Sequence, residues 1–128
     1  MAYYQPEIET ASREQIHAWQ EERFLKTFHR VWKNNAYYRQ KMIDAGLSDK
    51  DVTSLADLQK LPFLTKDDLR EAYPFGLMSA PLSDCVRIHS TSGTTGKRVI
   101  AFYTENDLAL WDDICARAIV AAGGTRDD

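Results

Sequence analysis

The chain has 128 residues, of which 44% are hydrophobic and 27% charged, as expected of a folded domain with one core. Sixteen Lys and Arg stand against 19 Asp and Glu, so the formal net charge is −3. Generic binding to nucleic acid requires a basic excess, so we expect no nucleic-acid partner. Aromatic residues make up 11% of the chain, which has only four prolines and six glycines, and this composition argues against disorder.

The sequence shows no export or membrane signal. Residues 1–7 lack a basic region and an apolar stretch, and the longest plain apolar run, residues 118–122, is far too short to span a bilayer. The two cysteines, Cys85 and Cys115, have neither zinc-site spacing nor a Cys-x-x-Cys pattern. We therefore expect a cytoplasmic protein without a membrane partner and with reduced thiols, a disulfide between the two cysteines being the alternative.

The first part of the chain predicts two helices. Ser12 and Gln15 form a capping-box pattern that begins a helix over residues 13–33. Its apolar residues recur at helical spacing and predict core packing rather than a box for an aromatic substrate: Ile16, Trp19, Phe24, Leu25, Phe28, Val31 and Trp32. A second helix is expected over residues 36–45, with Gly46 as its left-handed stop.

Two shorter helical turns follow. Ser54 leads one that ends before Pro62, and Thr65 leads another that ends before Pro74. Residues 74–84 are rich in Pro, Gly and Ser and predict a loop.

The last third of the chain changes its periodicity. Residues 85–89 and 98–103 predict two strands, and a long helix begins at the Thr104 cap, with Asp107 three residues on, and stops at Gly123. The expected fold class is α/β: a helical half over residues 1–80, a strand–loop–strand hairpin over 85–103 and a helix over 104–124. We expect residues 1–128 to form a single incomplete domain whose exposed apolar helix face promotes self-association or domain exchange.

The segment between the predicted strands is unlike any other window of the chain. It reads Ser-Thr-Ser-Gly-Thr-Thr-Gly-Lys from Ser90 to Lys97, so five of its eight residues carry hydroxyls. Glycines let backbone N–H groups approach an anion, hydroxyls donate to phosphate oxygens, and Lys97 adds positive charge. This is not a Walker A loop, because only two residues separate Gly93 from Gly96, Arg98 follows the lysine, and a strand comes next. The pattern predicts a phosphate-binding loop, with a ligand-free hairpin connection as the alternative.

The loop also resembles a known one. Residues 92–97, Ser-Gly-Thr-Thr-Gly-Lys, are similar to the phosphate-binding loop of the adenylate-forming superfamily, which includes acyl-CoA synthetases, luciferases and peptide-synthetase adenylation domains. The flanking segments resemble the N-terminal portion of phenylacetate–coenzyme A ligases: SREQIHAWQEERF, NNAYYRQKMIDAG, LADLQKLPFLTKDDLREAYPFGL and VRIHSTSGTTGK. The resemblance runs over residues 12–124 and implies part of the large N-terminal domain of an adenylate-forming enzyme.

The resemblance implies ATP, Mg²⁺, coenzyme A and an aryl carboxylate as ligands of a complete enzyme. In that family the carboxylate attacks the α-phosphate of ATP, giving acyl-AMP and pyrophosphate, and the thiol of coenzyme A then displaces AMP. Magnesium offsets the phosphate charge. The family's loop holds the β- and γ-phosphates, and in this chain that role falls to Thr91, Ser92, Gly93, Thr94, Thr95, Gly96 and Lys97.

Two departures from the family pattern limit what the resemblance implies. The family usually has proline after the loop lysine, where this chain has Arg98. Family members are also several times longer, so we expect most of the aryl pocket, the nucleotide-binding motifs beyond the loop, the magnesium-binding acid and the catalytic lysine to be missing. We therefore expect no catalytic residue and no metal ligand in this fragment, and no activity without a complementing C-terminal chain.

Three functional interpretations stay open: the N-terminal part of a phenylacetate–CoA ligase-like enzyme, a non-catalytic nucleotide-binding protein, and a helical interaction fragment. His89 lies next to the loop, and we interpret it as a hydrogen-bonded structural residue, with a nucleotide contact as the alternative. Arg87 and Arg98 flank the loop as candidates for assisting phosphate binding, or as ordinary exposed arginines.

Overall fold

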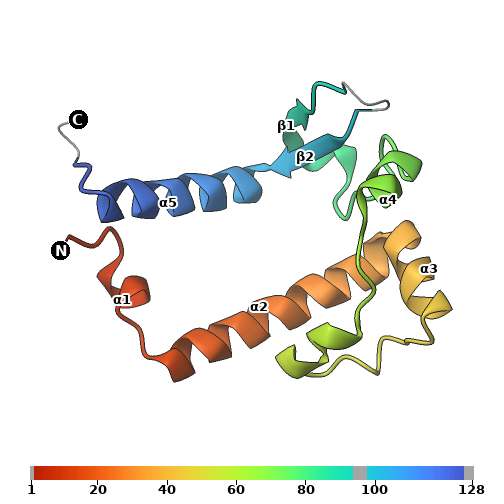
Figure 1. The fold of residues 1–128 in the computed structure, drawn as a ribbon, viewed down its shortest axis with the longest axis horizontal. Helices are drawn as coiled ribbons and strands as arrows, with labels where there is room; N and C mark the ends of the chain where they lie inside the picture. Colours follow the sequence, from red (N-terminus) through yellow and green to blue (C-terminus); the bar gives the residue numbers. More distant parts are fainter. Residues whose placement is uncertain (1, 94–97, 126–128) are drawn as a thin grey trace.

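The computed structural model describes residues 2–93 and 98–125, in which a helical first part is followed by a two-stranded antiparallel sheet and a long helix (Figure 1). The α-helices and strands are α1 (Pro6–Glu9), α2 (Arg13–Asn34), α3 (Ala36–Asp44), α4 (Lys66–Glu71), β1 (Cys85–Ser90), β2 (Ile100–Thr104) and α5 (Glu105–Ala121). Two 3₁₀ helices lie in the connections, η1 (Leu55–Lys60) and η2 (Leu82–Asp84). The predicted mixture of helices with a strand–loop–strand hairpin is confirmed.

Polar side chains set the limits of the first long helices. The Ser12 hydroxyl accepts a hydrogen bond from the Gln15 N–H at 3.2 Å and begins α2. Asn35 leaves the helical conformation after α2, and its side-chain oxygen accepts from the Tyr38 N–H at 2.9 Å to begin α3. After α3, Gly46 adopts a φ of 79°. The predicted limits of both helices are confirmed to within one residue.

The hydrophobic core lies where α2 and α3 pack against the segment that leads to η1. Phe28, Met42 and Val52 are buried at its centre. Partly buried apolar side chains surround them: Phe24, Leu25, Trp32, Tyr38, Leu47 and Leu61. The interpretation of the aromatic stripe on α2 as core packing is therefore confirmed for its second half, whereas Trp19 is half-buried outside this cluster.

One buried carboxylate fixes α4 against α3. Asp68 is 8% exposed and accepts hydrogen bonds from the Lys41 ammonium at 2.6 Å, the Tyr37 hydroxyl at 2.9 Å and the Thr65 N–H at 2.6 Å. The Lys41 ammonium and the Thr65 donors hold the pKa of Asp68 well below its usual range. Burial, together with the carboxylates of Asp68 and Glu71, raises the pKa of Tyr37 to about 12.

The hairpin leads directly into the last helix. In the antiparallel register Ile88 lies opposite Phe102. At the end of β2, the Thr104 hydroxyl accepts from the Asp107 N–H at 3.3 Å, and the Asp107 carboxylate accepts from the Thr104 N–H at 2.9 Å. This capping box begins α5, and Gly123, with a φ of 100°, follows its end, so the predicted helix is confirmed.

Three details differ from the expectations. The second strand begins at Ile100 instead of residue 98, because the Val99 N–H donates to the side-chain hydroxyl of Thr91 and not to a backbone carbonyl of the opposite strand. The predicted loop over residues 74–84 ends in the helical turn η2. Helix α1 was not expected, although Pro6 at its first position and acidic residues in its first turn are typical helix-start signals.

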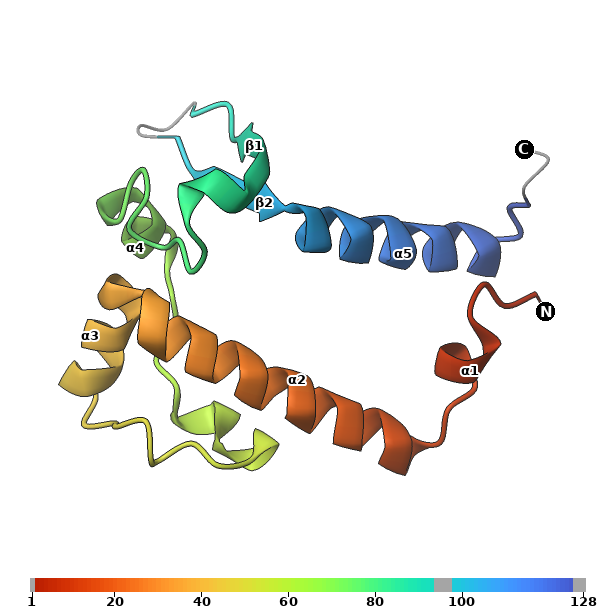
Figure 2. The same ribbon diagram turned by 180° about the vertical axis from the view of Figure 1, so that it is seen from behind.

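The two long helices, α2 and α5, run along opposite sides of the molecule (Figures 1 and 2). The hairpin and α4 connect them at one end, and α1 lies beside the end of α5 at the other. There the Gln5 side-chain amide donates to the Asp113 carboxylate at 2.5 Å. None of the helices in the described residues is long and apolar enough to cross a membrane.

Candidate functional site

The candidate site lies at the tip of the β1–β2 hairpin. Beyond the end of β1, the Thr91 N–H donates to the Val99 carbonyl at 3.0 Å, and the Thr91 hydroxyl oxygen accepts from the Val99 N–H at 3.1 Å. These two bonds close the base of the loop. Because the hydroxyl oxygen of Thr91 accepts here, its proton stays free to be donated to a ligand oxygen.

The described part of the loop has a backbone suited to an anion. Gly93 has a φ of 71°, in the left-handed region that favours glycine, and Ser92 before it is exposed. Left-handed residues contribute to the backbone concavities whose N–H groups bind anions. Thr91, Ser92 and Gly93 thus lie together at the tip of the hairpin. The other predicted site residues lie outside the described part of the chain: Thr94, Thr95, Gly96 and Lys97.

His89 belongs to an aromatic cluster. Its ring centroid lies 5.0 Å from that of Tyr103 and 5.5 Å from that of Trp111. The structure therefore gives His89 a packing role through its ring, in place of the expected role through a hydrogen bond. Arg98 is exposed at the end of the loop, where it can attract an anion. Arg87 is exposed on β1, but it lies opposite Tyr103, away from the loop end of the strand.

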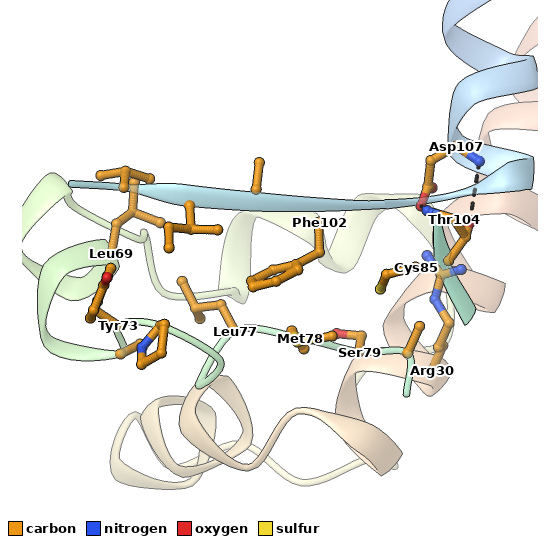
Figure 3. Close-up of a pocket in the computed structure, with 16 residues that line it drawn as sticks. Arg30, Leu69, Tyr73, Leu77, Met78, Ser79, Cys85, Phe102, Thr104 and Asp107 are labelled. Carbon is orange, nitrogen blue, oxygen red and sulfur yellow. Dashed lines mark hydrogen bonds between the residues drawn. The ribbon is translucent and has the colours of Figure 1, made fainter. Parts of the chain in front are cut away.

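A cavity of about 320 Å³ lies on the face of the hairpin toward which Phe102 points (Figure 3). Leu69 and Tyr73 stand at one end of it and Arg30 and Asp107 at the other (Figure 3). Hydrogen bonds from Thr104 hold the pKa of Asp107 below its usual range, so this end carries charges of both signs. No local sequence pattern indicated this cavity, because its walls come from segments far apart along the chain.

The described residues contain no group of three or more His, Cys, Asp or Glu arranged to hold a metal ion. Cys85 is half-buried and Cys115 exposed, and both are free thiols in the structure. The chemistry that the described site offers is therefore hydrogen-bond donation and positive charge, directed at an anion.

The chain is similar in sequence to known enzymes of one class. No protein-family model matches the chain. However, it is 43% identical over 94% of its length to the phenylacetate-coenzyme A ligase of Thermus thermophilus, and 44% identical over 94% to that of Escherichia coli. The resemblance to phenylacetate–coenzyme A ligases is confirmed. The chain spans only 27% and 28% of these two relatives and corresponds to their N-terminal portion.

Solved structures of another CoA ligase share this fold. The crystal structure of 2-hydroxyisobutyryl-CoA ligase in the postadenylation state, in complex with R3-HIB-AMP, matches with a TM-score of 0.83 and 25% identity. It aligns with 95% of this chain and 26% of its own. The same ligase in complex with 2-HIB-AMP and CoA matches with a TM-score of 0.79 and 28% identity over 90% of this chain and 25% of its own. The described chain therefore has the fold of part of an adenylate-forming CoA ligase.

Proposed function

We propose that this chain is the N-terminal part of an AMP-forming CoA ligase for a phenylacetate-like aryl acid, to which it contributes the loop that holds the phosphates of ATP. The observation that carries this proposal is the 40–44% identity with phenylacetate–CoA ligases over 94% of the chain. The closed loop base and the left-handed Gly93 support it, because they present hydroxyls and backbone N–H groups at one tip.

In this proposal the loop acts on the leaving group of the first step. A carboxylate oxygen of the aryl acid forms a bond to the α-phosphorus of ATP, the bond from that phosphorus to the bridging oxygen breaks, and pyrophosphate leaves with the electron pair. Hydroxyls of Thr91 and Ser92 donate to its oxygens, Gly93 allows close backbone approach, and Lys97 neutralises charge. The proposed loop comprises Thr91, Ser92, Gly93, Thr94, Thr95, Gly96 and Lys97. The catalytic contribution is electrostatic stabilisation without covalent bonding.

The second step and its cofactors belong to the whole enzyme. Coenzyme A supplies the thiol that displaces AMP from the acyl-adenylate, and Mg²⁺, when bound, reduces the charge of the phosphates. The proposal places the metal ligands and the catalytic lysine outside this chain, which spans only 27% of the T. thermophilus relative. We further propose that residues 1–128 are one incomplete domain, because the chain spans only 27% of the T. thermophilus relative. The proposal places the protein in the cytoplasm, because free thiols such as Cys85 and Cys115 are typical of a reducing compartment.

The test combines this chain with a relative from which the matching N-terminal segment has been removed. We expect co-expression with E. coli phenylacetate–CoA ligase lacking its N-terminal quarter to restore ATP–pyrophosphate exchange that depends on phenylacetate. Lys97→Ala should slow the exchange by about 100-fold, as when one preorganised charge partner of a transition state is lost. Lys50→Ala, at an exposed lysine remote from the loop, is the matched control.

The outcomes separate the three interpretations. Unchanged exchange in Lys97→Ala would remove this lysine from the mechanism. If the purified pair forms a complex without exchange while this chain alone binds ATP tightly, a non-catalytic nucleotide-binding function replaces the proposal. If neither exchange nor ATP binding occurs, the chain is an interaction fragment.

A further inference from the structure

Helix α5 presents an apolar stripe that the described residues leave uncovered. Leu110 is 51% exposed, Trp111 41% and Ile114 50%. Their spacing places all three on one side of the helix. Together with Tyr103 at the end of β2 they line a groove of about 470 Å³, which we call the α5 groove.

One end of the α5 groove is built from packed aromatic rings. The ring centroids of Tyr103 and Trp111 lie 5.4 Å apart, and the His89 ring packs against both. Asp107 is the charged residue among those that line the groove, and one of its carboxylate oxygens accepts hydrogen bonds from the Thr104 N–H at 2.9 Å and the Thr104 hydroxyl at 2.8 Å. A partner therefore gains mostly apolar contact in the groove and meets this carboxylate where it already has hydrogen-bond donors.

The lengths of the related proteins indicate which polypeptide covers the α5 groove. The chain adopts the fold of 2-hydroxyisobutyryl-CoA ligase with a TM-score of 0.83 but spans 26% of that chain, and it spans 27% of the T. thermophilus relative. About three quarters of a related enzyme therefore has no counterpart here. A contiguous exposed patch of large apolar side chains is typical of an interaction surface.

We propose that the α5 groove docks the polypeptide that corresponds to the remaining three quarters of a phenylacetate–CoA ligase, through an apolar face of that polypeptide. This inference rests on the proposed function and names the surface and the partner through which that function is assembled. Trp111 is the expected anchor, because tryptophan is among the side chains that most often carry the affinity of an interface. Ile114 adds half-exposed apolar surface beside it.

The experiment measures assembly without measuring catalysis. This chain, carrying an affinity tag, is co-expressed with E. coli phenylacetate–CoA ligase that lacks the segment matched here, and the amount of the truncated enzyme that is soluble and co-purifies is quantified. We expect co-purification with the wild-type chain and a loss of at least about tenfold with Ile114→Glu. Ala109→Glu introduces the same charge at an exposed position on the opposite side of α5 and should retain co-purification.

Further measurements keep the result unambiguous. Full-length E. coli enzyme should not co-purify, because its own N-terminal segment occupies the partner surface. Circular dichroism of Ile114→Glu alone should match the wild type.

Failure of the wild-type chain to retain the truncated enzyme, or equal retention by Ile114→Glu and Ala109→Glu, would overturn the proposal. A dimer of this chain in sedimentation that Ile114→Glu dissociates would assign the groove to a second copy instead. Co-purification without pyrophosphate exchange would support the docking surface and count against the proposed activity alone.

Discussion

One carboxylate oxygen of Asp68 binds α3, which is far away in sequence, and the other binds the cap of its own helix. One oxygen accepts from Lys41 and Tyr37, and the other accepts from the backbone and side chain of Thr65. In Asp68→Asn, either orientation of the amide directs its NH₂ group at hydrogen-bond donors. We expect this variant to unfold at a clearly lower temperature than the wild type in a thermal melt.

A neighbouring aspartate provides the control. The side chain of Asp67 is 88% exposed and pairs with Arg70 on the surface of α4. Surface pairs contribute little to stability, so Asp67→Asn should change the melting temperature only slightly. Equal effects of Asp67→Asn and Asp68→Asn would show that the Asp68 hydrogen bonds do not stabilise the fold.

The low pKa of Asp68 predicts a pH dependence of the free energy of unfolding. Hydrogen bonds from Lys41 and Thr65 hold this pKa well below its value in the unfolded chain, which is about 3.9. As the pH falls, the unfolded chain therefore binds the proton first. The stability due to Asp68 is present above about pH 4 and is lost as the pH falls further, toward the folded-state pKa.

Urea titrations at a series of pH values measure this effect. We expect the urea midpoint of the wild type to fall more steeply between about pH 5 and pH 2 than that of Asp68→Asn. Asp67→Asn should keep the wild-type steepness. Parallel curves for the wild type and Asp68→Asn would contradict the assignment of the low pKa to this residue.

At the scale of single residues, the sequence predicted those roles that depend on near neighbours. Thr65 was expected to cap a helical turn, and the structure adds that Asp68 completes its capping box. The contact of Asp68 with Lys41 was not predicted, because the two residues lie 27 positions apart and are brought together only by packing of α4 on α3. For the same reason, the ring packing of His89 on Trp111 had no sequence signal.

The start of α5 shows how one residue links two elements, since Thr104 ends β2 and caps the helix. Thr104→Ala removes the hydroxyl that accepts from the Asp107 N–H, so we expect a loss of about 1 kcal/mol in the free energy of unfolding. Amide exchange should quicken in the first turn of α5. Thr104→Ser keeps the hydroxyl and should lose less, and equal losses in the two variants would rule out the cap as the cause.

Elements were predictable where their limits are set by local signals. The helices α2, α3, α4 and α5 follow the caps Ser12, Asn35, Thr65 and Thr104, each of which bonds to a backbone N–H three residues away. The start of β2 was predicted two residues early, because a strand limit depends on pairing across the hairpin, where Thr91 binds Val99. The cavity beside Phe102 and the α5 groove depend on the arrangement of several elements and had no local signal.

At the scale of the whole molecule, contacts between segments far apart in sequence position the N-terminal segment relative to α5. The N-terminal segment reaches α5 through Gln5, whose side-chain amide donates to Asp113, 108 positions away. Asp113 is itself fixed by Arg117, one turn further along α5, at 3.0 Å. This tie places α1 beside the end of α5 opposite the hairpin (Figures 1 and 2).

Gln5→Ala tests whether this tie holds the N-terminal segment in place. The Gln5 backbone N–H donates to the Glu9 carboxylate at 2.7 Å, so the substitution removes the side-chain contact and leaves the helix start intact. We expect faster amide exchange in α1, measured by mass spectrometry, and a loss of about 1 kcal/mol in the free energy of unfolding. Glu7→Ala, at an exposed position of the same helix, is the control and should leave the exchange of α1 close to that of the wild type. If Gln5→Ala and Glu7→Ala exchange alike, the segment is held by its backbone and apolar contacts, and the amide of Gln5 contributes nothing to the position of α1.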